Sequence, residues 1–357
     1  EALSPDNYID EDGKDISPSG YDIHFEQVKF SYGKGDEKRN VMEGVSFTAQ
    51  EGTTTYQVLK LPASAHAAAL GGENISAIDD SPAAGWSNPA LFANVSDKSL
   101  GLDFMTYNSG SLYLGAQYVQ AFGERHTAAA GLSILNYGKM DETDETGQRI
   151  GSFSPKDMML SLAYSYLLSE RWTGGASLHF INRNYAGYTS FAMGVDLGLN
   201  YFNEETDFSF SIALRNIGME VKSFYETSRD KLPFDMQLGL TKGLAHFPAR
   251  LNFTLTDLTH WKSSDFYLPP GKTSLSATQK LLNHVVVGVD ILPTDNTYIA
   301  LGYNFRRGYE LKVGDAQKLA GFTLGAGLQL KRFKFGASYA KYRVGAGSLL
   351  FNVAYTL

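Results

Sequence analysis

The chain has 357 residues, of which 43% are hydrophobic and 36 are glycine, and it contains no cysteine. Its 31 Lys and Arg residues are outnumbered by 38 Asp and Glu residues, so the formal net charge is -7. No basic patch appears, which argues against nucleic acid as a partner. The lack of cysteine excludes disulfides, thiolate metal sites and a cysteine nucleophile. No apolar run reaches the roughly 20 residues of a spanning helix, so any membrane part must cross with strands.

Residues 1–20 are acidic and rich in Ser, Pro and Gly, and we expect a disordered lead-in there. No signal peptide is visible, and because the sequence starts at Glu1 rather than at Met, a processed or truncated start stays open.

Residues 21–55 carry a pattern of their own. It consists of Asp22-Ile23-x-Phe25-x-x-Val28-x-Phe30-Ser31-Tyr32, then Val41-x-x-Gly44-Val45-Ser46-Phe47 and Glu51-Gly52. This pattern resembles the opening strands of an ABC-transporter ATP-binding domain, and the resemblance implies that Tyr32 would stack on adenine. The phosphate-binding loop should follow Thr55 within a few residues, and it does not. We therefore expect an incomplete fragment, either a natural fusion or a gene-assembly chimera, that forms a small hairpin or stays loosely ordered.

Residues 56–97 show helix signals rather than strand signals. Leu61 to Gly72 has a proline near its start, an alanine-rich middle and two glycines at its end, which predicts a short helix. Asn88-Pro89-Ala90 predicts the start of a second one. If the strands that follow close into a barrel, this segment is expected in the lumen as a plug. We take Gly71, Gly72, Asn88, Pro89 and Ala90 as the plug motif.

Residues 98–357 are a series of short stretches in which apolar and small polar residues alternate with a period of two. Leu160, Leu162 and Tyr164, for example, share one face, and Ser161 and Ala163 share the other. Such stretches, separated by Gly, Asn, Asp, Ser and Pro, predict antiparallel strands joined by hairpins. Their predicted starts are Lys98, Gly110, His126, Asp157, Arg171, Phe191, Asp207, Phe234, Arg250, His284, Thr297, Phe322, Arg332 and Ser348. We therefore predict an all-β fold, a transmembrane antiparallel β-barrel of about 14 strands.

A soluble β-sandwich would also show alternation, but its outward face would carry Lys, Glu and Arg. Here the second face is mostly Gly, Ala, Ser, Thr, Asn and Gln, which favours a filled lumen. Aromatic residues near strand ends are expected at the lipid interface. They are Tyr107, Tyr113, Tyr118, Phe122, Trp172, Tyr201 and Phe202.

The last residues form an alternating stripe that ends on the final residue: Leu349, Phe351, Val353, Tyr355 and Leu357. Phe351, Val353, Tyr355 and Leu357 resemble the C-terminal insertion signal of outer-membrane barrels, except that Leu357 replaces the usual final Phe. The plainer interpretation is a closing strand that pairs with the first strand.

Motifs spread over residues 56–357 resemble one family. They are Tyr56-Gln57-Val58-Leu59-Lys60-Leu61-Pro62-x-Ser64-Ala65, Ala68-Ala69-Leu70-Gly71-Gly72, Asp79-Asp80, Asn88-Pro89-Ala90, Asn136-Tyr137-Gly138, Asp144-Glu145-x-Gly147, Gly151-x-Phe153-Ser154, Asn216-x-Gly218, Leu232-Pro233-Phe234-Asp235 and Leu258-x-x-Trp261. Together they resemble the PorQ family of the type IX secretion system. The Asn-Pro-Ala turn is shared more widely with PorV and FadL-like fatty-acid transporters, and Asn-x-Gly alone is common turn chemistry.

The resemblance implies a FadL-like barrel in the outer membrane of Bacteroidetes. It also implies a non-catalytic scaffold in the type IX attachment complex, which holds a surface protein of the PorZ type and other type IX components. Long external loops at 138–156, 218–233 and 259–283 are then expected to contact the partner.

Enzymatic and metal-binding interpretations have little support. The seven histidines, His24, His66, His126, His179, His246, His260 and His284, lack metal-ligand spacing. Ser228-x-x-Lys231 and Gly271-Lys272-Thr273 match short catalytic or phosphate-binding motifs without the residues that must accompany them. The acidic run from Asp141 to Gly147 lacks the ligand spacing of a calcium loop, and we expect a solvated external turn. We predict no catalytic residue, no metal and no cofactor.

Two alternative functions stay open beside the scaffold. A FadL-like transporter of hydrophobic small molecules would need a continuous apolar path past the plug near Leu70 and Trp86. An ATP-binding protein would need measurable nucleotide affinity despite the missing phosphate loop.

Overall fold

The computed structural model describes the backbone of residues 23–32 and 39–49, and it describes residues 56–107, 110–143, 148–224, 229–268, 274–311, 319–343 and 346–357. The chain divides into two units, Glu1–Gly52 with Pro269–Lys272, and Thr53–Leu268 with Thr273–Leu357. In the first unit β1 (Ile23–Tyr32) pairs with β2 (Arg39–Ala49) in antiparallel fashion, as the sequence predicts. The lead-in of residues 1–20 and the junction at Thr55 lie outside the described residues.

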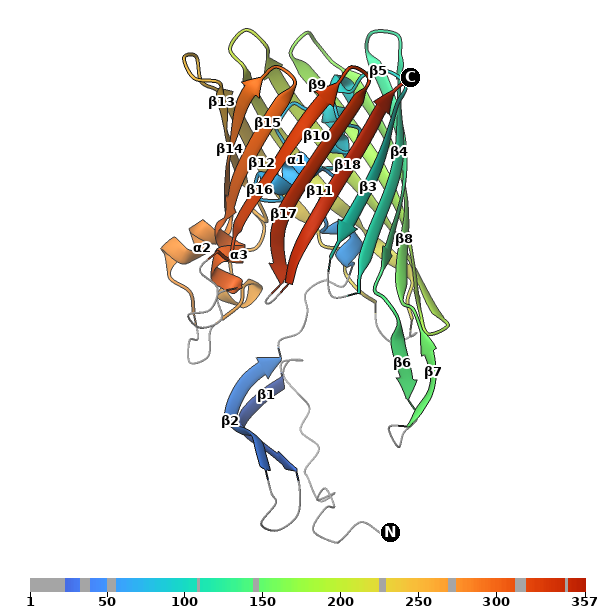
Figure 1. Cartoon of the computed structure of the whole chain (residues 1–357), viewed down its shortest axis with the longest axis vertical. Helices are drawn as coiled ribbons and strands as arrows, with labels where there is room; N and C mark the ends of the chain where they lie inside the picture. The colour runs from blue at the N-terminus through green and yellow to red at the C-terminus, as the bar shows by residue number, and fades with distance from the viewer. Residues whose placement is uncertain are drawn as a thin grey trace. The chain divides into compact units, whose positions relative to one another are not determined.

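The second unit is built on a closed barrel of fourteen strands in which each strand pairs with its neighbours in antiparallel fashion (Figure 1). The strands are β3 (Ser99–Thr106), β4 (Leu112–Phe122), β5 (His126–Asn136), β8 (Lys156–Leu167), β9 (Trp172–Tyr185), β10 (Tyr188–Asn203), β11 (Phe208–Lys222), β12 (Asp235–Gly243), β13 (Ala249–Leu255), β14 (Val285–Thr294), β15 (Thr297–Asn304), β16 (Phe322–Leu330), β17 (Phe333–Arg343) and β18 (Ala346–Thr356). This confirms the predicted architecture. The largest error in a strand start is at β10, which begins at Tyr188 rather than Phe191.

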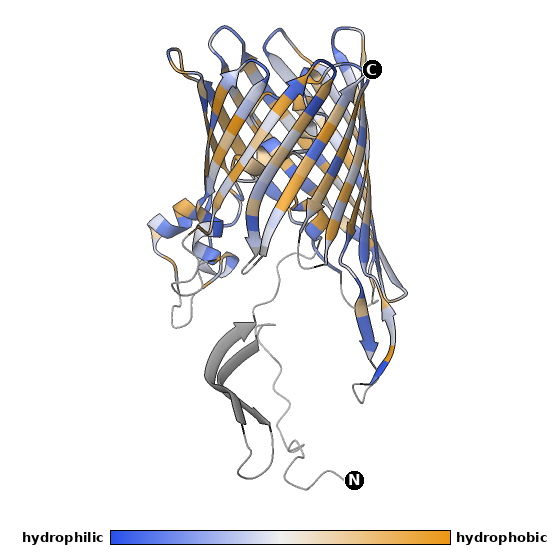
Figure 2. Cartoon of the chain, viewed as in Figure 1, coloured by the Kyte–Doolittle hydropathy of each residue, from blue (hydrophilic) through white to orange (hydrophobic). Residues whose placement is uncertain are grey.

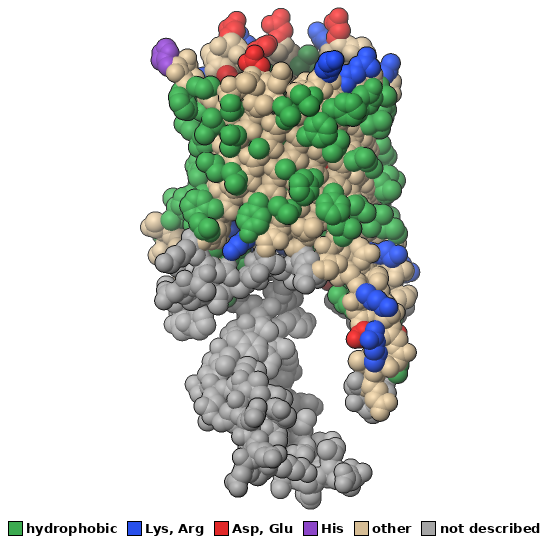
Figure 3. Space-filling model, viewed as in Figure 1, with side chains coloured by type: hydrophobic (Ala, Val, Ile, Leu, Met, Phe, Trp, Pro, Cys, Tyr) green, Lys and Arg blue, Asp and Glu red, His purple; other side chains and the backbone are tan. Residues whose placement is uncertain are grey.

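The period-two pattern places apolar side chains outside the barrel and small or polar side chains inside. On β3, Leu100, Leu102 and Phe104 are 44%, 62% and 41% exposed, whereas Ser99 and Asp103 are buried. The same alternation on the other strands surrounds the barrel with apolar side chains, and charged side chains gather beyond the two ends of this belt (Figures 2 and 3). Such an outer surface is stable only in contact with lipid. The β-sandwich alternative is wrong, because one sheet closes on itself.

The lipid-interface prediction is wrong for three of the aromatic residues. Phe202 shares the inward face of β10 with Asn200 and lies opposite the buried Ser209 of β11. Tyr107 and Tyr113 are 6% and 3% exposed and belong to a cluster of buried side chains inside the barrel. Tyr113 lies on the same face of β4 as Gly115 and Gln117, which is the inward face. A sequence shows that a residue lies near the end of a strand. Whether its side chain faces lipid or the lumen depends on the register of the whole strand.

The barrel has two different ends, which we call the short-turn end and the long-loop end. At the short-turn end, uppermost in Figure 1, two residues join β14 to β15 and two join β16 to β17, and the last residue, Leu357, lies there too. The long-loop end carries a hairpin, β6 (Met140–Thr143) with β7 (Arg149–Phe153), and the helical segments η6 (Ser263–Asp265), α2 (Ala277–Asn283) and α3 (Phe305–Glu310). Outer-membrane barrels keep short turns on the periplasmic side, so the long-loop end is extracellular.

The external segments are more ordered than the sequence predicts. The segment 138–156 contains a β-hairpin, and 259–283 contains η6 and α2. Asn216-x-Gly218, taken as turn chemistry, lies inside β11, where the pairing register with β10 shifts and Asn216 has a φ of 59°. Asn216 is therefore part of a β-bulge, a feature that re-aims the rest of the strand.

The apolar belt generates a test of the membrane position. Leu301→Arg, on the outward face at the middle of β15, should destabilise the barrel in lipid vesicles by about 2–4 kcal/mol. Leu330→Arg, at the end of β16 beside the short turn, should cost roughly 0–1 kcal/mol, because its charge can reach water. The two leucines are similarly exposed, at 46% and 53%. Guanidinium unfolding, followed by the heat-dependent shift in gel migration, measures both; equal losses would contradict the assigned bilayer position.

Candidate functional site

The lumen of the barrel holds residues 56–97, which we call the plug (Figure 1). Its elements are η3 (Gln57–Leu59), α1 (Ala65–Ala69), η4 (Ala84–Trp86) and η5 (Pro89–Asn94). The α1 helix starts at Ser64, whose side chain accepts a hydrogen bond from Ala67 N, and stops before Gly71, which has a φ of +99°. No helix among the described residues is long and apolar enough to span a bilayer.

The plug touches the barrel wall where the wall has glycines. A Cβ atom at Gly302 of β15 would lie 2.2 Å from the backbone N of Gly71, and one at Gly288 would lie 2.7 Å from a methyl carbon of Leu70. On the opposite wall, a Cβ atom at Gly198 would lie 1.9 Å from Oδ1 of Asn88, and one at Gly175 would lie 2.4 Å from the carbonyl carbon of Pro89. Both halves of the predicted plug motif therefore lie against a wall that leaves no room for side chains.

The Asn88-Pro89-Ala90 turn is held by its own side chain. Asn88 is fully buried; its Oδ1 accepts a hydrogen bond from Ala90 N at 3.1 Å, and its Nδ2 donates to Ile75 O at 3.1 Å. Pro89 occupies the first helical position of η5, where a missing N–H costs nothing. Gly72 faces Arg307 of α3, because a Cβ atom there would lie 2.5 Å from a guanidinium nitrogen.

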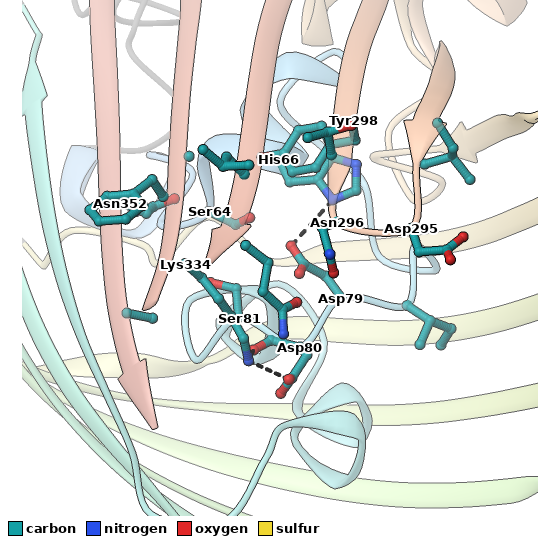
Figure 4. Close-up of a pocket in the computed structure, with 18 of the residues that line it drawn as sticks. Ser64, His66, Asp79, Asp80, Ser81, Asp295, Asn296, Tyr298, Lys334 and Asn352 are labelled. Atoms are coloured by element: carbon teal, nitrogen blue, oxygen red, sulfur yellow. Dashed lines mark hydrogen bonds and ion pairs between the residues drawn. The ribbon is translucent and has the colours of Figure 1, made fainter. Parts of the chain in front are cut away.

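A first polar latch at the short-turn end joins the plug to β17 (Figure 4). The Lys334 ammonium group forms an ion pair with the Asp80 carboxylate and donates to Asp80 O at 2.7 Å. The same carboxylate accepts hydrogen bonds from Ser96 N at 2.5 Å and Ser96 Oγ at 2.7 Å. Asp80 thus links Ser96, near the end of the plug, to Lys334 of the barrel wall.

A second latch is centred on His66 of α1, which is stacked on Tyr298 with 4.1 Å between ring centroids. His66 Nε2 lies 2.8 Å from Asp290 Oδ1, and its Nδ1 lies 3.2 Å from Asp79 Oδ2. Burial by itself lowers the pKa of His66, but the carboxylates of Asp290 and Asp79 outweigh it and raise that pKa to about 10. The imidazole is therefore protonated at neutral pH and donates from both nitrogens.

Further hydrogen bonds join the plug to the rest of the wall. Ala65 N donates to Asn352 Oδ1, and Asn352 Nδ2 donates to Ala63 O at 2.9 Å. Near the long-loop end, the Tyr56 hydroxyl donates to Glu220 at 2.8 Å. The plug is consequently docked along the lumen through polar contacts and through apolar clusters shared with the wall.

Three cavities around the plug bear on a path through the barrel. A cavity of about 170 Å³ lies at the short-turn end beside the two latches, and a cavity of about 520 Å³ lies at the long-loop end. Trp86 lines a central cavity of about 40 Å³, enough for only a few waters. Leu70 is 1% exposed against the wall. Among the described residues, the apolar path past Leu70 and Trp86 that transport would need is not open.

The remaining predicted site residues are spread over the barrel. Phe351 and Val353 lie on the outward face of β18, opposite Phe104 and Leu102 of β3, and Leu357 N donates to Lys98 O at 3.1 Å. They help to close the barrel; their role as an insertion signal stays a prediction. No group of three or more His, Cys, Asp or Glu within the described residues could hold a metal ion. Ser228, Gly271-Lys272-Thr273 and the acidic turn at 144–147 lie outside those residues.

Sequence reasoning missed both latches. The partners are separated by 254 residues for Asp80 and Lys334 and by 224 for His66 and Asp290. Asp79-Asp80 stands out in the sequence only as part of a family motif, and nothing local indicates its partners.

No protein-family model and no curated protein matches the chain. Solved structures with the same fold do match. A TodX deltaS2S3 mutant, described as a monoaromatic hydrocarbon channel, has a TM-score of 0.52 at 13% identity, covering 82% of this chain and 98% of that one. A TodX deltaS2 mutant gives 0.50 at 13% identity, covering 81% and 96%. The toluene transporter TodX of Pseudomonas putida gives 0.49 at 12% identity, covering 81% and 95%. The chain therefore has the FadL-like, 14-strand, outer-membrane barrel fold.

Loss of the Asp80 carboxylate should loosen the plug. Asp80→Asn removes the ion pair with Lys334, whose side chain is mostly buried. The loss should weaken plug docking by about 1–3 kcal/mol. Hydrogen–deuterium exchange of residues 61–95 should accelerate, while exchange of the barrel strands should not change. Asp295→Asn is the matched control, because Asp295 lines the same cavity and makes no ion pair within the described residues. Equal acceleration in both variants would contradict the latch.

The His66 latch should depend on pH. Because the pKa is higher in the docked plug than in an unfolded chain, the stabilisation is complete below about pH 6.5 and is lost as the pH rises through about 10. Exchange of α1 should therefore accelerate between about pH 7 and about pH 10, after correction for intrinsic exchange. His66→Gln should exchange faster at neutral pH and lose this dependence. A wild-type profile that is flat over the same range would show that His66 carries no charge in the latch.

Proposed function

We propose that this protein is a non-catalytic outer-membrane anchor whose plugged barrel holds a protein partner at the cell surface. The observation that carries the proposal is the closed lumen: the plug is docked against β9, β10, β14 and β15, and the central cavity at Trp86 is only about 40 Å³. A barrel closed in this way offers a partner a rigid platform, and its extracellular end presents the β6–β7 hairpin and the helices α2 and α3.

Within this proposal, the partner is a surface protein of the PorZ type in the attachment complex of type IX secretion in Bacteroidetes, where secreted cargo is processed and attached. The support is the series of PorQ-like motifs. Some of them form the plug, such as Leu61-Pro62 and Asn88-Pro89-Ala90, and others lie at the long-loop end, such as Leu232-Pro233-Phe234-Asp235 and Leu258-x-x-Trp261. The family resemblance therefore covers both the closed lumen and the proposed platform.

The platform is itself a folded structure. Arg306 of α3 donates to Asp257 at 2.7 Å and to Asp265 O at 3.3 Å, which joins the β13–β14 segment to the β15–β16 segment. Trp261 and Leu281 are 45% and 52% exposed there. Exposed apolar side chains on a braced surface are typical of protein interfaces.

A second candidate is transport of hydrophobic small molecules. It is favoured by the comparisons, since the solved structures of this fold include proteins described as monoaromatic hydrocarbon channels. Transport would require the plug to move, because the central cavity at Trp86 is too small for an organic ligand. The comparisons support this candidate more than the anchor, and the closed lumen supports the anchor more than transport. Nothing in the described residues supports ATP binding.

Exchange of residues 259–283 for a short Gly/Ser linker tests the anchor. The barrel should stay folded, as shown by the migration shift on boiling, while co-purification of the surface partner is lost. Replacing Asp295-Asn296 at the short-turn end with Gly-Ser is the control, and it should leave co-purification intact. Retention of the partner by the 259–283 variant would refute this platform.

Uptake measurements separate the two candidates. Purified protein in lipid vesicles should not increase the entry rate of toluene above that of protein-free vesicles, and planar bilayers should show no steady conductance. A rate increase that saturates with toluene concentration would favour the transporter.

A further inference from the structure

The cavity of about 520 Å³ at the long-loop end, which we call the external vestibule, is lined by both basic and acidic side chains. Its lining includes Lys60 and Glu73 from the plug, Arg215 from β11, and Arg306 and Arg307 from α3. A volume of this size accommodates a small organic molecule.

Most acidic groups around the vestibule already have partners. Asp257 and Glu310 both accept hydrogen bonds from Arg306, at 2.7 and 2.8 Å. Asp235 accepts from Asp257 N at 2.6 Å, and Asp265 accepts from Lys262 N at 2.8 Å. These carboxylates are therefore not in need of a cation.

The guanidinium groups of Arg215 and Arg307, in contrast, each have a nitrogen atom without a hydrogen-bond partner. Arg215 Nε and Arg307 Nη1 are buried and have no hydrogen-bond partner, and the two side chains are only 16% and 15% exposed. The carboxylate between them is Glu73, but its oxygens lie 3.9 Å from Arg215 Nη1 and 3.7 Å from Arg307 Nη2, beyond hydrogen-bond distance. The buried carboxylate of Asp196 also faces Arg215, with its Oδ2 3.9 Å from Arg215 Nε. Gln237 Nε2 donates to Glu73 at 3.3 Å.

Buried charged donors without acceptors are costly, and an anion with two or more oxygens is the group that satisfies guanidinium forks best. The Arg307 guanidinium carbon also lies 4.4 Å from the centre of the Tyr342 ring, which holds the fork in position. Glu73 supplies a counter-charge to both arginines and Asp196 supplies a second one to Arg215, each beyond hydrogen-bond distance. An incoming anion would therefore compete with Glu73 for both arginines.

We propose that the external vestibule binds a small hydroxylated organic anion, a sugar phosphate or a sugar acid, through Arg215 and Arg307, in competition with Glu73. The anionic group would lie between the two guanidinium groups near Lys60. The hydroxyl groups would face Thr256, Asn304 and the carboxylates that line the other side. The proposal concerns the lumen and does not depend on the partner platform.

Isothermal titration calorimetry of the full chain in neutral detergent tests it, with glucose 6-phosphate and glucuronate as probes and glucose as the uncharged control. At least one anionic probe should bind, and glucose should not. Arg215→Gln and Arg307→Gln should each weaken binding roughly tenfold to a hundredfold, the effect of losing a charged hydrogen bond. Arg307→Lys should recover only part of the affinity, because an ammonium group lacks the planar fork.

Glu73→Gln separates ligand binding from a structural role. If Glu73 competes with the ligand, its neutralisation should strengthen binding severalfold; if Glu73 only holds the plug, the same variant should weaken it. Heat-dependent gel migration verifies that every variant keeps a closed barrel. Absence of binding by both anionic probes to the wild type and to Glu73→Gln, or unchanged affinity in the two arginine variants, would overturn the proposal. If an arginine variant loses probe binding and still co-purifies with the surface partner, ligand binding in the vestibule is independent of the anchor function.

Discussion

The structure depends on one constraint: every backbone hydrogen-bonding group that faces lipid must have a partner within the barrel itself. The fourteen strands meet this requirement only because β18 pairs with β3, which joins residues near the end of the chain to residues that follow the plug. Closure also fixes the register of every strand, and the register decides which side chains face lipid and which face the lumen. The apolar belt and the polar interior are two results of the same closure.

The filled lumen follows from side-chain size. A 14-strand barrel leaves an interior that its own small inward side chains do not fill, and the plug occupies this space. The plug can approach the wall closely because Gly175, Gly198, Gly288 and Gly302 present only backbone. Buried polar atoms require partners in such an interior, and the latches at His66 and Asp80 supply them. The plug is therefore held both by directional polar contacts and by apolar clusters that its side chains share with the wall.

This arrangement frames the functional question. Solved barrels of the same fold include hydrocarbon channels, whereas the interior described here is divided by polar contacts and has no open apolar route among its described residues. The external face is the more elaborated one, with a hairpin, helices and a vestibule in which Arg215 and Arg307 each have a buried nitrogen without a hydrogen-bond partner. The closed interior and the developed surface are the observations behind the proposed anchor, whereas the comparisons support conduction.

The sequence by itself determined the class of the fold. The alternation with a period of two, together with short turns and small inward residues, specifies a lipid-facing barrel. It also gives the number of strands and their approximate starts, because the pattern is local and repeats in each strand. The helical character of α1 and the Asn88 turn are also local signals. Only the tertiary structure decided which residues meet. Tyr107 and Tyr113 face the lumen, Asn216 forms a bulge, and the Asp80–Lys334 and His66–Asp290 pairs join residues more than two hundred positions apart. Such pairs depend on closure of the ring and on the depth at which the plug docks, and neither quantity is encoded in any short stretch of the chain.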